Sequence, residues 1–135
     1  MIYAVIDTNV FVSAMLTHHS DSATVILYRK LLNGEMIPLY NKEILAEYKE
    51  VLSRPKFSFQ AEVIKSIVEY IRTYGILSER VQYLETMPDE TDRVFYEVTL
   101  SHEEAYLVTG NQRHFPQDPI VVTPAQMLEI LNEQA

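Results

Sequence analysis

Five polar residues that lie far apart in the sequence could together bind a divalent cation: Asp7, Glu47, Asp89, Asp92 and Asn111. Carboxylates that share one site repel each other and raise one another's pKa values unless a cation neutralises them. The chain contains no cysteine, so its candidate ligands are mainly oxygens, which favour a hard cation such as Mg²⁺ or Mn²⁺ over zinc. A divalent-cation site follows from these residues only if the fold brings them together.

Each of these residues also has a purely structural interpretation. Asp7 and Asp92 precede segments with helical periodicity, and aspartate is a common N-cap residue. Glu47 fits a solvent-exposed helix face, and both Asp89 and Asn111 fit polar loops and turns. Convergence at one place in the fold is what would separate a site from these alternatives.

Apolar runs and amphipathic segments alternate along the chain and predict strands and helices. Strands are expected at residues 2–6, 36–40, 81–84, 105–108 and 120–122. Helices are expected after Asp7, from residue 21 or 22 to 32, from 41 to 52, across 63–71, from 91 or 92 to 100, and from 123 to 131. Asn41 and Thr123 fit helix N-caps, whereas Gly34 and Gly75 fit C-terminal ends.

This alternation predicts an α/β fold with a parallel sheet that helices cover on both faces. Such sheets bind ligands beyond the carboxyl ends of their strands, near the point where the strand order reverses. Asp7 follows the first predicted strand directly, and Asn111 follows the fourth after a two-residue step. If the helical crossovers are right-handed, the five polar residues can therefore meet at one edge of the sheet.

Length and composition exclude several classes of protein. The 135 residues predict a single domain across residues 1–135, and a net charge of −8 argues against a simple nucleic-acid coat, which needs a basic surface. No apolar stretch approaches the about 20 residues that span a bilayer, and Asp7 interrupts the N-terminal apolar run, which argues against a secretory signal. We therefore expect a cytoplasmic protein without a membrane partner. His114, beside Arg113, could face a phosphate, but we expect it to be a surface residue.

Four segments resemble the motifs of the PIN-domain ribonuclease family. The sequence IDTNVFVSA at 6–14 resembles the opening motif, and ILAEY at 44–48 resembles the glutamate-bearing helix. DETD at 89–92 resembles the third, aspartate-bearing motif, and YLVTGN at 106–111 resembles the fourth. The matches occur in family order and cover nearly the whole chain.

The resemblance implies a three-layer α/β/α sandwich with a central, mainly parallel sheet, and Mg²⁺- or Mn²⁺-dependent hydrolysis of RNA phosphodiester bonds. By matching positions, the catalytic and metal-binding acids are Asp7, Glu47 and Asp92. Auxiliary positions are Asp89, the hydroxyls of Thr8 and Thr109 near the metal, and Asn111, where the motif usually carries a fourth aspartate. Many family members are toxins that a small antitoxin inhibits, so an antitoxin partner is implied besides the RNA substrate. We also expect a homodimer.

Two alternatives stay open at this point. With Asn111 in the fourth motif and a net charge of −8, the domain could be a catalytically weak PIN-like module that binds RNA or a protein. Asp7 could instead be the nucleophile of a phosphatase similar to haloacid dehalogenases. Those enzymes need another aspartate two residues later, where this chain has Asn9. The residues that would bind RNA are not identified by the sequence.

Overall fold

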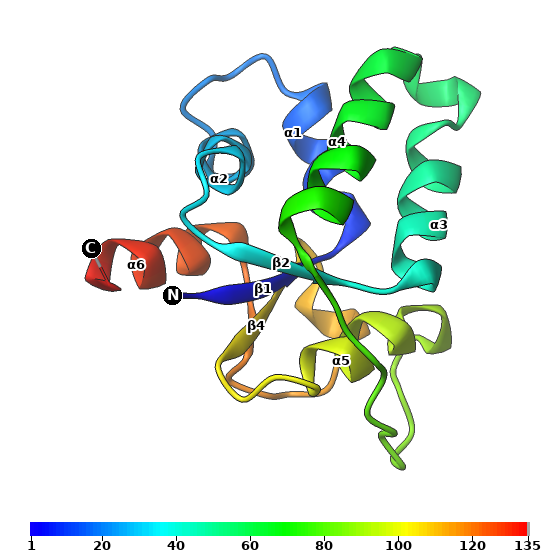
Figure 1. The fold of residues 1–135 in the computed structure, drawn as a ribbon, viewed down its shortest axis with the longest axis vertical. Helices are drawn as coiled ribbons and strands as arrows, with labels where there is room; N and C mark the ends of the chain where they lie inside the picture. Colours follow the sequence, from blue (N-terminus) through cyan, green and yellow to red (C-terminus); the bar gives the residue numbers. More distant parts are fainter. Residues whose placement is uncertain (135) are drawn as a thin grey trace.

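Five parallel strands form the central sheet of the computed structural model, which describes residues 1–134 (Figure 1). They are β1 (Tyr3–Ile6), β2 (Ile37–Tyr40), β3 (Ile76–Leu77), β4 (Ala105–Val108) and β5 (Val121–Val122), in the order β3-β2-β1-β4-β5. Most side chains of β1, β2 and β4 are buried, because helices cover both faces of a parallel sheet. Ala135, the last residue of the predicted domain, lies outside the described residues.

Six α-helices surround this sheet in the part of the chain that the structure describes. They are α1 (Thr8–Leu16), α2 (Ala23–Leu32), α3 (Lys42–Leu52), α4 (Ala61–Tyr74), α5 (Arg93–Thr99) and α6 (Pro124–Gln134), with the 3₁₀ turns η1 (Pro55–Phe57), η2 (Glu90–Asp92) and η3 (Gln112–His114). Helices α1, α2 and α4 lie on one side of the sheet and α5 lies on the other (Figure 1). The predicted α/β/α sandwich with a parallel sheet is therefore confirmed.

Local sequence signals set several helix ends. The side chain of Asn41 accepts a hydrogen bond from the amide of Ile44 at the start of α3 (2.8 Å). At the start of α6, the backbone amide of Thr123 donates to the side-chain oxygen of Gln126, and the backbone amide of Gln126 donates to the hydroxyl of Thr123. This reciprocal pair is a capping box. Gly34, with a φ of 77°, follows the end of α2 in the left-handed region that glycine adopts without a Cβ clash. These predicted caps are confirmed.

The strand order reverses between β1 and β4, and this is where a parallel sheet can bind a ligand. Ile6 pairs with Val108 at the carboxyl ends of these two strands. The amide of Asp7 continues the ladder by donating to the carbonyl of Val108 (2.9 Å), so Asp7 and Thr109 leave the sheet side by side. Tyr48 of α3 is buried and donates its hydroxyl to the carbonyl of Ile6, which holds α3 at the same edge.

The predicted strand at residues 81–84 is wrong, and the edge strand β3 lies at Ile76–Leu77 instead. Gly75 is the cause, because it allows α4 to end directly against β2. A Cβ at Gly75 would lie 2.4 Å from the carbonyl oxygen of Ile71 and 2.6 Å from that of Pro38. The chain therefore reaches β2 immediately after α4 and pairs with it there, before residues 81–84, where the apolar pattern predicts a strand.

Residues 78–88 form a loop that side chains of α5 hold in place. Glu97, only 5% exposed, accepts hydrogen bonds from the side chain of Arg80 (2.8 Å) and from the amide of Tyr83 (2.9 Å). Arg93 donates to the carbonyl of Tyr83 (2.6 Å). Polar groups of the loop are thus satisfied by side chains instead of a strand ladder. Val81 and Leu84 stay exposed, Leu84 at 83%, whereas Met87 is buried.

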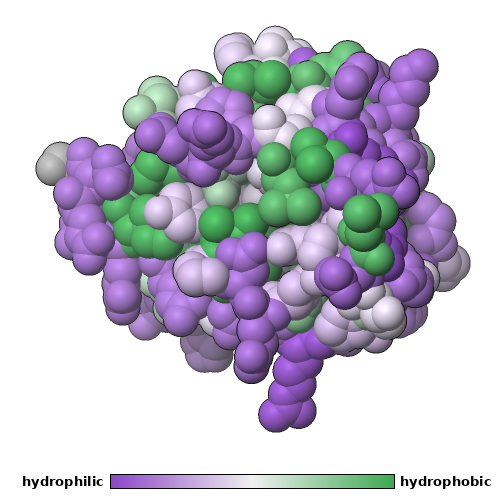
Figure 2. Space-filling model, turned by 90° about the horizontal axis from the view of Figure 1, so that it is seen from below, coloured by the Kyte–Doolittle hydropathy of each residue, from purple (hydrophilic) through white to green (hydrophobic). Residues whose placement is uncertain are grey.

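Seen from below, on the side of the sheet where α5 lies, the molecule shows small apolar areas surrounded by polar side chains (Figure 2). Within residues 1–134, none of the helices combines the length and the apolar character that crossing a bilayer requires.

Replacing Gly75 should be far more costly than replacing Gly34. The substitution Gly75→Ala puts a methyl group against two backbone oxygens that cannot move aside, and we expect a loss of about 3 kcal/mol in the free energy of unfolding. Gly34→Ala has open space around it and brings only left-handed strain, about 1 to 2 kcal/mol. Urea unfolding of both variants and the wild type measures the difference. Equal losses would contradict the close packing at Gly75.

Candidate active site

Asp7 occupies the N-cap position of α1, but its carboxylate does not cap the helix. Its Oδ2 accepts hydrogen bonds from the hydroxyl of Thr109 (2.8 Å) and from the amide group of Asn9 (3.2 Å). Asp7 is only 4% exposed and Thr109 is fully buried. The side chain of Asp7 therefore makes no N-cap hydrogen bond, and helix capping does not account for its burial.

Glu47 reaches the same edge of the sheet from α3. It is half-buried, and its Oε2 accepts a hydrogen bond from the hydroxyl of Thr8, the residue after Asp7. The neighbouring Tyr48 fixes the helix through its bond to β1. Glu47 is therefore held at the site and does not belong to a freely solvated helix face.

Asp92, Asp89 and His114 form the outer part of the site. Asp92 precedes α5 without a capping hydrogen bond from its side chain, and its Oδ2 lies 3.0 Å from Nδ1 of His114. Oδ2 of Asp89 lies 3.6 Å from the same nitrogen. One ligand atom from each of these three residues lies within 4.8 Å of the other two. They form a group that could hold a metal ion, and of the three predicted metal ligands only Asp92 belongs to it within residues 1–134.

Asn111 contacts this group through His114. Its side-chain nitrogen lies 2.8 Å from Nε2 of His114. When this nitrogen donates, Nε2 accepts, and the ring proton sits on Nδ1, facing Asp92. The backbone amide of Asn111 donates to the hydroxyl of Thr109 (3.0 Å), which itself donates to Asp7. Asn111 therefore connects the two parts of the site: its backbone amide reaches Asp7 through Thr109, and its side chain reaches Asp92 through His114.

The three predicted catalytic acids influence one another electrostatically. Burial raises the pKa of Asp7 to about 6, the hydrogen bond from Thr109 opposes this rise, and the charge of Asp92 adds to it. Burial also raises the pKa of Glu47, with a further contribution from Asp7. The pKa of Asp92 is raised by burial and by the charges of Asp89 and Glu47, against the hydrogen bond from His114. The acids thus carry unfavourable charge that a cation would relieve.

The donor set fits a divalent cation. Carboxylate oxygens suit Mg²⁺ and Mn²⁺, and an imidazole nitrogen adds a ligand that first-row transition metals accept. Two ligands placed at right angles, about 2.1 Å from one ion, lie about 3 Å apart. The separations of 3.0 Å and 3.6 Å that Nδ1 of His114 makes with Asp92 and Asp89 are close to this spacing.

Sequence reasoning placed five polar residues at this edge and expected His114 at the surface. The imidazole of His114 is partly exposed, and it also contacts Asp92, which the sequence did not predict. One signal was available. Residues three apart in a 3₁₀ turn lie above each other, so a turn after Asn111 would have placed His114 next to it.

Comparison with known proteins gives one match. The family model of the PIN domain matches residues 3–113, which include every predicted site residue and end one residue before His114. Searches of curated proteins and of solved structures found no match.

In the absence of metal, replacing Asp7 by asparagine should stabilise the protein near neutral pH. A folded-state pKa of about 6, above the ordinary 3.8 of an unfolded chain, means that the folded protein binds this proton more tightly. The contribution of this proton to the free energy of unfolding is fully present below about pH 4 and is lost as the pH rises through about 6. Asp7→Asn is neutral throughout, so we expect it to be more stable than the wild type by up to about 3 kcal/mol at pH 7.

Urea unfolding between pH 4 and pH 7.5 in EDTA measures this effect. The matched control is Asp21→Asn, because Asp21 is exposed before α2; its stability should follow that of the wild type. A difference between Asp7→Asn and the wild type that does not change with pH would contradict the raised pKa.

Proposed function

This chain belongs to the PIN-domain family, and we propose that it is a Mg²⁺- or Mn²⁺-dependent ribonuclease that hydrolyses phosphodiester bonds in RNA. The family consists in general of metal-dependent nucleases. One observation carries the proposal. Asp7, Glu47 and Asp92 come from three distant segments, influence one another's pKa values, and gather where the strand order reverses. Asp7 is buried, and Glu47 and Asp92 are half-buried.

The proposed roles follow from the contacts. Asp7, Glu47 and Asp92 would hold the cation, with Asp89 and His114 on its outer side. Thr8 and Thr109 donate hydrogen bonds to Glu47 and Asp7, and these bonds fix the orientation of the two carboxylates. A bound divalent cation supplies a water of lowered pKa and neutralises the charge that develops on the phosphate oxygens.

Hydrolysis adds the hydroxide of water to phosphorus and its proton to the leaving 3′ oxygen. The products would therefore be a 5′-phosphate and a 3′-hydroxyl. A net charge of −8 repels RNA, so a cation between the carboxylates and the phosphate would assist binding as well as cleavage.

The finer parts of the sequence-based interpretation stay predictions. They are the role of a toxin in a toxin–antitoxin pair, the antitoxin partner, the homodimer and the cytoplasmic location. The alternative of a weak PIN-like binding module has one feature in its favour, since Asn111 contacts His114 and brings no charge to the cluster.

The ribonuclease proposal predicts that Asp7→Asn abolishes metal-dependent cleavage. Loss of a direct ligand should lower the rate by more than the 10- to 100-fold typical of residues that only support a ligand, so we expect a loss of about 100-fold or more. The assay incubates purified protein and end-labelled single-stranded RNA with Mn²⁺, with Mg²⁺ and with EDTA. Asp21→Asn is the control and should cleave like the wild type. RNA that binds but is not cut in Mn²⁺ would favour the binding module.

His114 should contribute to metal affinity independently of catalysis. Asn111 has a donor and an acceptor on its side chain, so rotation of its amide can support the ring with its proton on Nε2, which frees Nδ1 to bind a cation. We expect His114→Gln to weaken Mn²⁺ binding by about tenfold or more. Electron paramagnetic resonance measures the affinity and also the nitrogen coupling of bound Mn²⁺. This coupling should disappear in His114→Gln and persist in His18→Gln, which changes an exposed histidine. Wild-type protein without nitrogen coupling would exclude His114 as a ligand.

A further inference from the structure

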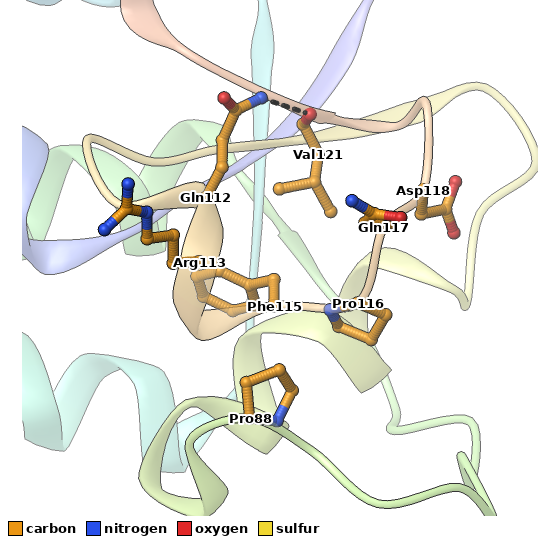
Figure 3. Close-up of a pocket in the computed structure, with 8 residues that line it drawn as sticks. All are labelled: Pro88, Gln112, Arg113, Phe115, Pro116, Gln117, Asp118 and Val121. Atoms are coloured by element: carbon orange, nitrogen blue, oxygen red, sulfur yellow. Dashed lines mark hydrogen bonds between the residues drawn. The ribbon is translucent and has the colours of Figure 1, made fainter.

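A pocket of about 530 Å³ (Figure 3) is lined by the residues directly before Asp89 and on either side of His114, close to the acidic cluster of Asp7, Glu47, Asp89 and Asp92. Residues that line the pocket are neighbours in the chain of residues in the acidic cluster. Pro88, at one side of the pocket, directly precedes Asp89, and both Arg113 and Phe115 flank His114 in the sequence. A substrate that reaches the acids can therefore extend into this pocket. Its volume lies within the range of about 300 to 1,000 Å³ that is usual for small-ligand sites.

The pocket offers flat apolar surfaces from two different loops. Pro88 comes from the loop before η2 and faces Phe115 and Pro116 from the segment after η3 (Figure 3). Phe115 lines the pocket but is only 3% exposed, because most of its ring packs into the core. The more exposed rings of Pro88 and Pro116 are suited to the face of a nucleobase, since every base has a flat face that stacks without regard to its identity.

Two polar side chains of the pocket are available to a ligand. Neither Arg113 nor Gln117 makes a side-chain hydrogen bond or ion pair within residues 1–134, and both are exposed. Gln112 is engaged, because its amide nitrogen donates to the carbonyl of Val121 (3.0 Å). Asp118 is engaged as well, because its carboxylate accepts from the hydroxyl of Tyr96 (2.6 Å) and the amide of Ile120 (3.1 Å).

We infer that this pocket binds one nucleotide of the RNA substrate, adjacent to the phosphodiester bond that is cleaved at the acidic cluster. The base lies against Pro88 and Pro116, Gln117 contacts the polar edge of the base, and Arg113 contacts a phosphate. The inference rests on the proposed ribonuclease function. Charge favours this inference, because Arg113, a cation without an ionic partner in the described chain, lines the pocket and directly precedes His114 in a protein with a net charge of −8.

Binding of a fluorescein-labelled RNA octamer in EDTA tests the phosphate contact, because fluorescence anisotropy then reports affinity without cleavage. We expect Arg113→Gln to weaken binding by about fivefold at about 50 mM salt. The slope of log affinity against log salt should become less steep by about 0.7, the value of one contact to single-stranded nucleic acid. The matched control is Lys65→Gln, which removes one exposed positive charge from α4. Equal effects of the two substitutions would overturn the inference.

Homopolymer octamers of A, C and U test the base contact. The wild type should bind them with different affinities, since the amide of Gln117 can donate and accept hydrogen bonds. Gln117→Ala should reduce these differences and leave the salt slope unchanged. Equal binding of all three oligomers by the wild type, or a preference that Gln117→Ala does not alter, would overturn this part of the inference.

The experiments give different results if the nucleotide pocket is wrong and if the ribonuclease proposal is wrong. If RNA is not cut in Mn²⁺ but Arg113→Gln still weakens its binding in EDTA, the proposed function is wrong and the nucleotide pocket is right. If RNA is cut, and Arg113→Gln changes neither its binding nor KM, the function is right and the pocket is wrong.

Titration with AMP and UMP, followed by the NMR signals of the Gln112, Arg113 and Gln117 amides, gives a further check. Signals that do not move would also overturn the inference.

Discussion

The parallel pairing of β1 with β4 is the constraint on which the rest of this structure depends. It joins residues about a hundred positions apart, with Ile6 opposite Val108, and its last hydrogen bond is made by the amide of Asp7. Thr109 then meets the carboxylate of Asp7, and the loop after it brings Asn111 and His114 towards Asp92. A shift of this register by one residue would turn Asp7 to the opposite face of the sheet, and the acidic cluster would not form.

The acidic cluster shows a conflict between stability and function. Buried carboxylates with raised pKa values weaken the folded state near neutral pH. The surrounding groups limit this loss without removing the acids, because Thr8, Thr109 and His114 each make a hydrogen bond to one of them.

Much of the fold followed from local signals, and the exceptions have physical reasons. Apolar runs located β1, β2 and β4, and Asn41, Thr123 and Gly34 marked helix ends, because capping and strand burial depend on nearby residues. Residues 81–84 have a strand-like pattern but bind Glu97 of α5, and β3 forms early because Gly75 fits against β2. Both outcomes depend on contacts between distant segments. The acids of the site could be found from strand ends and family motifs, whereas the position of His114 depends on the path of one short turn.

The two strands at the edges of the sheet are also its shortest. β3 and β5 contain two residues each, while the longer, apolar β1, β2 and β4 lie inside. A sheet exposes unpaired backbone groups only along its margins, where other chains can add strands and start fibrils. Because these margins are so short here, the most fibril-prone segments of the chain become accessible only when the sheet itself opens.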